Sequence, residues 1–186
     1  MVHQGWLINE IKDWLVWIAI AVILSYVIGT VLSMSFGSAT PLVAVMSTSM
    51  LHDSSVETDY YAWMASRGFN RDELDKFPFP NGFNKGDVLV VVGAAPAEIK
   101  VGDVIVFQAA GQNYPIIHRV IQITYESNQT IYTTKGDNNP AQDRWITPYS
   151  AIQGKATFWV PVLGYVKVLP LDLCRAVAPC QRIFNV

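Results

Sequence analysis

The sequence predicts a mainly β domain of barrel or sandwich type, with one apolar N-terminal helix and a partly helical surface insertion. Three observations predict this fold. A long uncharged stretch lies near the N-terminus, a charged segment follows it, and short β-branched runs separated by turn residues make up most of the remainder. Short strands with frequent turn signals favour an antiparallel or mixed sheet over βαβ units. A length of 186 residues suits one domain with an appendage.

The first expected element is an apolar helix. No charged residue or histidine occurs between Trp14 and Leu51. The apolar run alone is longer than the about 20 residues that cross a hydrocarbon core as a helix. We therefore expect an N-terminal tail at 1–13, a transmembrane anchor at 14–36 and the β domain at 37–186. A cleaved secretory signal is the alternative, but its apolar core would be shorter.

Charge around this helix indicates its orientation. Lys12 precedes the apolar run, and the next basic residue after it is Arg67. The positive-inside rule then favours an extracytoplasmic β domain on a single-pass anchor in the cell membrane. The formal net charge of −2 provides no basic field, which argues against nucleic acid as a partner. Cys174 and Cys180 leave open both a disulfide and two free thiols.

After the apolar helix, the chain stays extended through 41–46 and then changes in composition. Residues 52–84 are rich in charge, and we interpret them as a surface insertion with helices near 57–67 and 71–76. Two Gly-Asp turns lead into β-branched runs, and further runs follow. The expected strands cover 88–92, 104–107, 115–123, 130–135, 152–160 and 162–168.

Ser49 is the first residue that suggests chemistry. A serine hydroxyl needs a positioned base before it becomes a good nucleophile. Three histidines are available. His3 precedes the expected anchor and would lie across the membrane, His52 is close to Ser49 only in sequence, and His118 lies in an apolar strand. By itself, a histidine in such a strand is more often a buried structural residue than a base.

Asp137 and Asp143 lie in a polar segment that could supply a carboxylate to such a histidine. A carboxylate that binds an imidazole holds its tautomer and stabilises the imidazolium. By itself, however, Gly-Asp-Asn-Asn-Pro is also strong turn chemistry. The acidic spacing does not follow the calcium pattern of an EF-hand, and we expect no metal and no cofactor.

Taken in order, these segments resemble type I signal peptidases of the archaeal and endoplasmic-reticulum branch. The resemblance covers about residues 12–168 without 52–84. It rests on Ser47-Thr48-Ser49-Met50, Gly86-Asp87, Gly102-Asp103, Ile117-His118-Arg119-Val120 and Gly136-Asp137-Asn138-Asn139 with the later Asp143. Family members often have proline and threonine soon after the serine motif, whereas this chain has Leu51, His52 and the insertion.

The resemblance implies a signal-peptidase-like β fold and a membrane-bound serine endopeptidase that removes signal peptides after small residues. Ser49 would be the nucleophile, and His118 occupies the position where the bacterial branch has its lysine base. Asp143 would be the third member and Asp137 a supporting carboxylate, while Ser47 and the Ser49 N–H would form the oxyanion hole. The implied partners are preprotein signal peptides, the lipid bilayer and the protein translocation machinery.

Two other classes of protein fit parts of the pattern. A membrane-anchored β domain could bind extended peptides without cutting them, with Ser49 and His118 as structural residues. A self-cleaving regulator of the repressor type would share the catalytic fold. Those regulators are soluble and use a serine–lysine pair, so the apolar helix and His118 count against that class.

Overall fold

The computed structural model describes residues 2–52, 54–126, 128–161, 163–165 and 168–169, with the backbone alone at 2–9 and 54–58. Cys174 and Cys180, for which the sequence leaves a disulfide open, lie outside these residues. The elements are α1 (Val2–Phe36), β1 (Leu42–Ala44), α2 (Ser54–Ala65), α3 (Arg71–Leu74), β2 (Val88–Val92), η1 (Pro96–Glu98), β3 (Val104–Phe107), β4 (Ile116–Glu126), β5 (Gln129–Lys135), β6 (Thr147–Pro148), η2 (Tyr149–Ala151) and β7 (Ile152–Val160).

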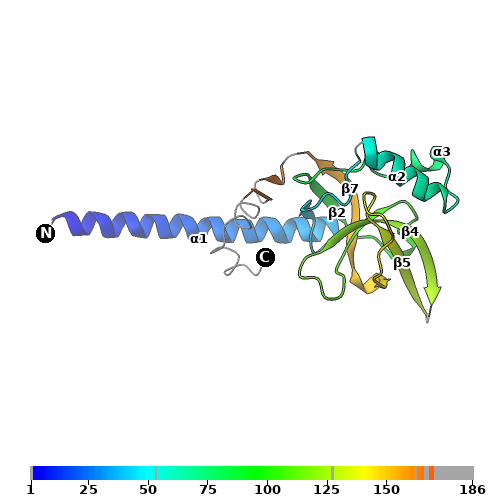
Figure 1. Ribbon diagram of the computed structural model, residues 1–186. Coiled ribbons are helices and arrows are strands. Elements are labelled where there is room, and N and C mark those ends of the chain that lie inside the picture. Colours follow the sequence, from blue (N-terminus) through cyan, green and yellow to red (C-terminus); the bar gives the residue numbers. More distant parts are fainter. Residues whose placement is uncertain (1, 53, 127, 162, 166–167, 170–186) are drawn as a thin grey trace.

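Helix α1 is continuous and projects away from the β domain (Figure 1). Its part Glu10–Phe36 is long and apolar enough to cross a membrane, with a mean hydropathy of 2.5. Large apolar side chains are exposed along it, among them Trp14 and Tyr26. A helix that is apolar on all sides suits a lipid environment better than water. The helix ends against the sheet, where the Gly93 N–H donates to the Phe36 carbonyl at 2.7 Å.

The β domain is one curled antiparallel sheet of seven strands in the order β1-β2-β7-β3-β4-β5-β6. The pairing of neighbours is antiparallel throughout. This confirms the mainly β fold, and five of the six expected strands have a counterpart. Irregularities in register interrupt the pairing between Val90 and Val91 and between Val120 and Gln122. Such bulges bend a sheet and increase its twist, which suits a half-barrel.

The expected strand at 162–168 is wrong over its described residues. Pro161 is followed by a turn and then by helical residues at 165 and 168. The Val168 N–H donates to the Gly164 carbonyl at 3.0 Å, which is a helical bond. Gly164 packs so closely on the turn before β2 that an added Cβ would lie 2.8 Å from the Gly86 carbonyl oxygen. This close backbone approach, and not a strand, explains the glycine at this position.

Both Gly-Asp turns have the same local structure. Gly86 and Gly102 have φ values of 94° and 96°, which favour glycine over any residue with a side chain. The carboxylate of Asp87 accepts from the Asn84 N–H, and that of Asp103 accepts from the Lys100 N–H, both at 2.8 Å. Each aspartate therefore closes the turn before its strand by binding the N–H three residues earlier.

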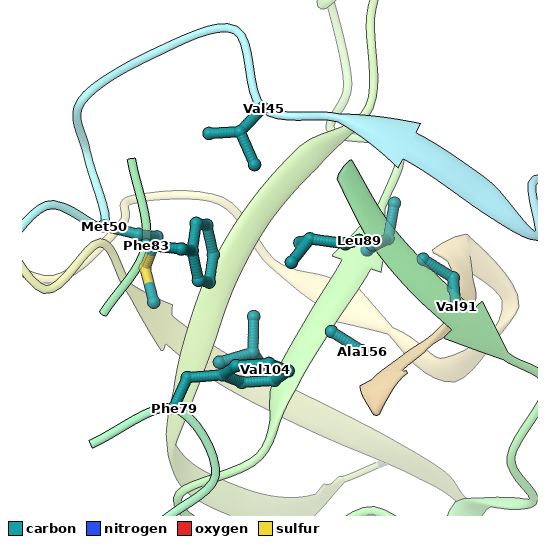
Figure 2. Packing of buried hydrophobic residues seen from close by; sticks show 9 residues of the cluster. Val45, Met50, Phe79, Phe83, Leu89, Val91, Val104 and Ala156 are labelled. Atoms are coloured by element: carbon teal, nitrogen blue, oxygen red, sulfur yellow. The ribbon is translucent and has the colours of Figure 1, made fainter. Parts of the chain in front are cut away.

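The core consists of two clusters on opposite faces of the central strand β3, all four residues of which are buried. Val104 and Val106 belong to one cluster, whereas Ile105 and Phe107 belong to the other. Figure 2 shows the first cluster, to which Met50 also belongs. A nearly fully buried methionine directly after Ser49 anchors the serine segment in the core.

The 52–84 segment is helical where expected, at α2 and α3. It has its own apolar cluster, in which Tyr60, Met64 and Leu74 pack with Ile121 of β4. A capping box begins α3, because Asn70 and Glu73 each accept from the backbone N–H of the other. The last part of the segment contributes Phe79 and Phe83 to the main core (Figure 2 labels both). The insertion is thus packed against the sheet at both ends.

Candidate active site

The serine segment is held in place through its backbone. Met50 is buried, and its carbonyl accepts from the Phe83 N–H at 3.0 Å. The Ser49 carbonyl accepts from the Asn138 N–H at 2.8 Å, and the Thr48 carbonyl accepts from Asn138 Nδ2 at 2.9 Å. The two bonds from Asn138 join residues about 90 positions apart in the sequence. The two serine hydroxyls remain at the surface of this segment, with Ser47 Oγ and Ser49 Oγ 3.1 Å apart.

His118 and Asp143 form a close pair. His118 lies on β4 opposite Ile105 of β3, and its side chain is only 7% exposed. Its Nδ1 lies 2.5 Å from Asp143 Oδ2. The same carboxylate oxygen accepts from Thr134 Oγ1 at 2.7 Å, and the Asp143 N–H donates to the Thr134 carbonyl at 2.8 Å. Asp143 is therefore oriented by β5 and in turn orients the imidazole.

The loop at 136–139 lies between this pair and the serine segment. A Cβ on Gly136 would be 2.8 Å from His118 Nε2, so the imidazole packs directly on this glycine. Two residues later, Asn138 binds the backbone of Thr48 and Ser49. The loop thus brings Nε2 of His118 and the segment of Ser49 to the same region. A side chain at position 136 would displace the imidazole.

Asp137 has other partners than His118. Its carboxylate accepts three hydrogen bonds from Arg119, the shortest at 2.6 Å from Nη2. Both side chains are almost fully buried. Arg119 also donates to the Pro78, Phe79 and Gly102 carbonyls. Burial alone would raise the pKa of Asp137, but Arg119 and His52 hold that pKa below its usual value.

His52 also binds the carboxylate of Asp137. Its Nε2 lies 3.0 Å from Asp137 Oδ2, and its ring packs on Tyr60 with centroids 4.7 Å apart. The chain therefore contains two histidine–aspartate pairs near Ser49. The charge of Asp137 is already compensated by Arg119, so Asp137 is poorly suited to stabilise an imidazolium. Within the described residues, no lysine or arginine forms an ion pair with Asp143, and this favours the His118 pair for base chemistry.

Lys135 is a buried cation beside the 136–139 loop. Its Nζ donates to the Gly136 carbonyl at 2.9 Å and to the Asp137 carbonyl at 3.0 Å. The ring of Trp63 in α2 lies 5.0 Å from Nζ. Desolvation lowers the pKa of Lys135, although Asp137 and Asp143 act in the opposite direction. Its bonds to the loop backbone give Lys135 a supporting position and not that of a base for Ser49.

The structure places the predicted site residues in two groups. Ser47 lies beside Ser49, and Asp143 binds His118, whereas Asp137 binds Arg119 and His52. Sequence reasoning assigned no role to Thr134, Arg119 or Asn138, and it considered His52 only as a histidine close to Ser49 in sequence. Arg119 follows His118 directly on β4, so alternation places the two side chains on opposite faces of the sheet. Within the described residues, no three His, Cys, Asp or Glu side chains gather as metal ligands.

Comparison with known proteins points to one group of relatives. The chain is 34% identical over 95 residues to the signal peptidase complex catalytic subunit SEC11 of Scheffersomyces stipitis, which covers 47% of this chain and 57% of the relative. The human subunit SEC11C is 32% identical over 99 residues, covering 48% of this chain and 51% of the relative. The SEC11 subunit of Candida albicans is 30% identical over 95 residues.

The chain is similar to catalytic subunits of the signal peptidase complex. The chain spans about half the length of the curated relatives that it matches. A scan against models of protein families finds no match. The similarity confirms the resemblance to signal peptidases of the endoplasmic-reticulum type over about half of the chain. The activity and substrates of the relatives enter below as proposals.

Proposed function

We propose that this chain is a membrane-anchored serine endopeptidase that removes N-terminal signal peptides from secreted preproteins. One observation carries the proposal. His118 on β4 pairs with Asp143, beside the 136–139 loop that binds the backbone of Ser49. Similarity to SEC11 subunits supports the same assignment. The proposed anchor is 14–36 and the proposed catalytic domain is 37–186, on the extracytoplasmic side of the membrane.

In the proposed reaction, Ser49 Oγ attacks the scissile carbonyl while its proton passes to Nε2 of His118. Asp143 holds Nδ1–H of the imidazole and stabilises the imidazolium that forms. The Ser47 hydroxyl and the Ser49 N–H donate to the oxyanion, and loss of one such donor costs about 3 kcal/mol. His118 then gives the proton to the leaving amine, which breaks the peptide bond and leaves an acyl-enzyme on Ser49. Water, activated by His118, hydrolyses this ester.

The Ser49 N–H meets no protein acceptor among the described residues, which leaves it available for this role. Asp137, expected from the sequence as a supporting carboxylate, would act through the structure of the loop. Its ion pair with Arg119 holds the segment that binds Thr48 and Ser49. No step of this reaction requires a cofactor or a metal ion.

The similarity also suggests the substrates and partners. Signal peptidases of this type cut after small residues, and we propose the same preference here. An apolar signal helix beside α1 would present its cleavage region to Ser49 as an extended segment. Extended peptides bind proteins through main-chain hydrogen bonds, with pockets for alternate side chains. The translocation machinery and further subunits of a complex are proposed partners.

The direct test is cleavage of a purified preprotein by the full chain in detergent, with the product identified by mass. We expect a single cut after a small residue, and we expect its loss when that residue is changed to a bulky one. Ser49→Ala should abolish the cut in a chain that stays folded. Equal binding of signal-bearing peptides by wild type and Ser49→Ala, with no cleavage by either, would make the chain a binding module instead.

A further inference from the structure

His52 is a buried polar residue that the proposed reaction does not use. Its side chain is 5% exposed, and its Nε2 lies 3.0 Å from Oδ2 of Asp137, which is 1% exposed. The ring of Tyr60 from α2 covers it, with centroids 4.7 Å apart. On another side, a Cβ on Gly82 would lie 2.8 Å from Cδ2 of His52. The ring is therefore enclosed in one orientation by both ends of the insertion.

The partner of His52 lies at the centre of the loop that holds the serine segment. The residue after Asp137 is Asn138, which binds the Thr48 and Ser49 carbonyls. The Asp137 N–H itself donates to Sδ of Met50 at 3.4 Å. Any shift of Asp137 would move these contacts, because they come from the same and the adjacent residue. His52 and Arg119 both bind Oδ2 of Asp137, so His52 adds a second anchor for the loop.

The insertion makes two further contacts with the same region. Trp63 of α2 packs over Nζ of Lys135, which donates to the Gly136 and Asp137 carbonyls. Arg67, just after α2, donates from Nη2 to Oε1 of Gln142 at 3.2 Å. Gln142 is the neighbour of Asp143. The insertion therefore contacts both the loop that holds Ser49 and the segment that carries the partner of His118.

We infer that His52 is a positioning residue for the proposed peptidase, and that it couples the 52–84 insertion to the placement of Ser49. This inference rests on the proposed function. His52 donates Nε2–H to Asp137, and this bond keeps the 136–139 loop in register with Thr48 and Ser49. His52 contacts neither the substrate nor the reacting atoms. A misplacement of about 1 Å at a reacting group can lower a rate by about 100-fold.

Three variants of the full chain in detergent test this role. His52→Ala removes the donor, whereas His52→Gln keeps an amide N–H donor at a similar reach. Tyr132→Phe is the matched control, because it removes one hydrogen bond of a buried side chain, to the Pro96 carbonyl, outside both the insertion and the 136–139 loop. Two measurements are made: steady-state kinetics, which give kcat and KM for a preprotein, and the rate of amide hydrogen exchange in the peptide that contains Asn138.

We expect His52→Ala to lower kcat by about 10- to 100-fold with little change in KM, as for a misplaced reacting group. Exchange at the Asn138 N–H should become faster in the same variant. His52→Gln should recover most of kcat and of the protection from exchange, and Tyr132→Phe should leave both near wild type.

The inference is overturned by any of three results. These are an unchanged kcat in His52→Ala, no recovery in His52→Gln, or an equal loss in Tyr132→Phe. If the wild type itself cleaves no preprotein, the proposed function fails. The exchange rates then still decide whether His52 holds the loop.

Discussion

At the scale of single residues, the two histidine–aspartate pairs differ in what else binds the carboxylate. Asp137 accepts from Arg119 and His52 in a fully buried site, whereas Asp143 accepts from His118 and Thr134. The first arrangement compensates a buried charge and supports structure. The second leaves the carboxylate free to stabilise a positive charge that develops on an imidazole. The two aspartates should therefore respond differently to the same substitution.

Asp143→Asn should lower kcat with little loss of stability. The amide keeps the size of the side chain but cannot stabilise the imidazolium, and the equivalent change in a Ser-His-Asp protease costs about 10⁴-fold. Steady-state cleavage of a preprotein measures this effect. Thr134→Val removes only one hydrogen bond to the same oxygen, so its loss of kcat should be smaller. Activity of Asp143→Asn within tenfold of wild type would exclude the proposed role of Asp143.

Asp137→Asn should instead lower the free energy of unfolding. It leaves the buried guanidinium of Arg119 without its countercharge, and removal of one partner of a buried ion pair costs about 3–5 kcal/mol. Urea unfolding of the full chain in detergent measures the difference. A variant as stable as wild type would show that the surrounding carbonyls alone satisfy Arg119.

The same pair predicts a dependence on pH. The folded-state pKa of Asp137 lies below its ordinary value of 3.8, because Arg119 and His52 outweigh the effect of burial. The unfolded chain therefore binds more protons near that pH. The contribution of the pair is complete above about 3.8 and is lost as the pH falls through the folded-state pKa. The stability gap between wild type and Asp137→Asn should narrow below this pH and stay constant above it.

At the scale of elements, the regular strands were predictable from the sequence because β-branched runs follow recognisable Gly-Asp turns. The helices of the insertion were predictable from the charged composition of residues 52–84. The strand expected at 162–168 was wrong, since its glycine serves a close packing contact that local pattern does not reveal. The burial of Arg119 was also not predictable from the sequence. Its carboxylate and carbonyl partners lie 17 to 41 positions away in the sequence.

Helix α1 supports a prediction about membrane integration. The double variant Ile23→Arg with Leu24→Arg places two arginines near the middle of the helix. It raises the free energy of transfer into the membrane by about 6 kcal/mol, at about 3 kcal/mol for each arginine. The double variant should be released from membranes by alkaline carbonate, whereas the wild type should resist. Ile146→Arg changes an even more exposed apolar residue of the β domain and should have no effect. Release of the wild type under these conditions would contradict the anchor.

At the scale of the whole molecule, residues of the sheet and of the insertion lie together around the serine segment. The resemblance to a family selected Ser49, His118 and Asp143 as candidate site residues. Their mutual arrangement was not predictable, because it depends on bonds such as that from Asn138 to Ser49. The contribution of the 52–84 segment was also not predictable, since it depends on contacts between residues far apart in the sequence. Its contacts through His52 and Trp63 became visible only in three dimensions.

The central claim is that Ser49 and His118 act as one unit in peptide cleavage. The most direct measurement compares kcat of the full-length wild type with Ser49→Ala, His118→Ala and the double variant, with folding checked by thermal unfolding. Residues that act as a unit are non-additive, so each single variant should lose about 10³-fold or more, and the double variant should lose no more. A folded His118→Ala that cleaves at a rate close to wild type, or losses that multiply in the double variant, would contradict the account.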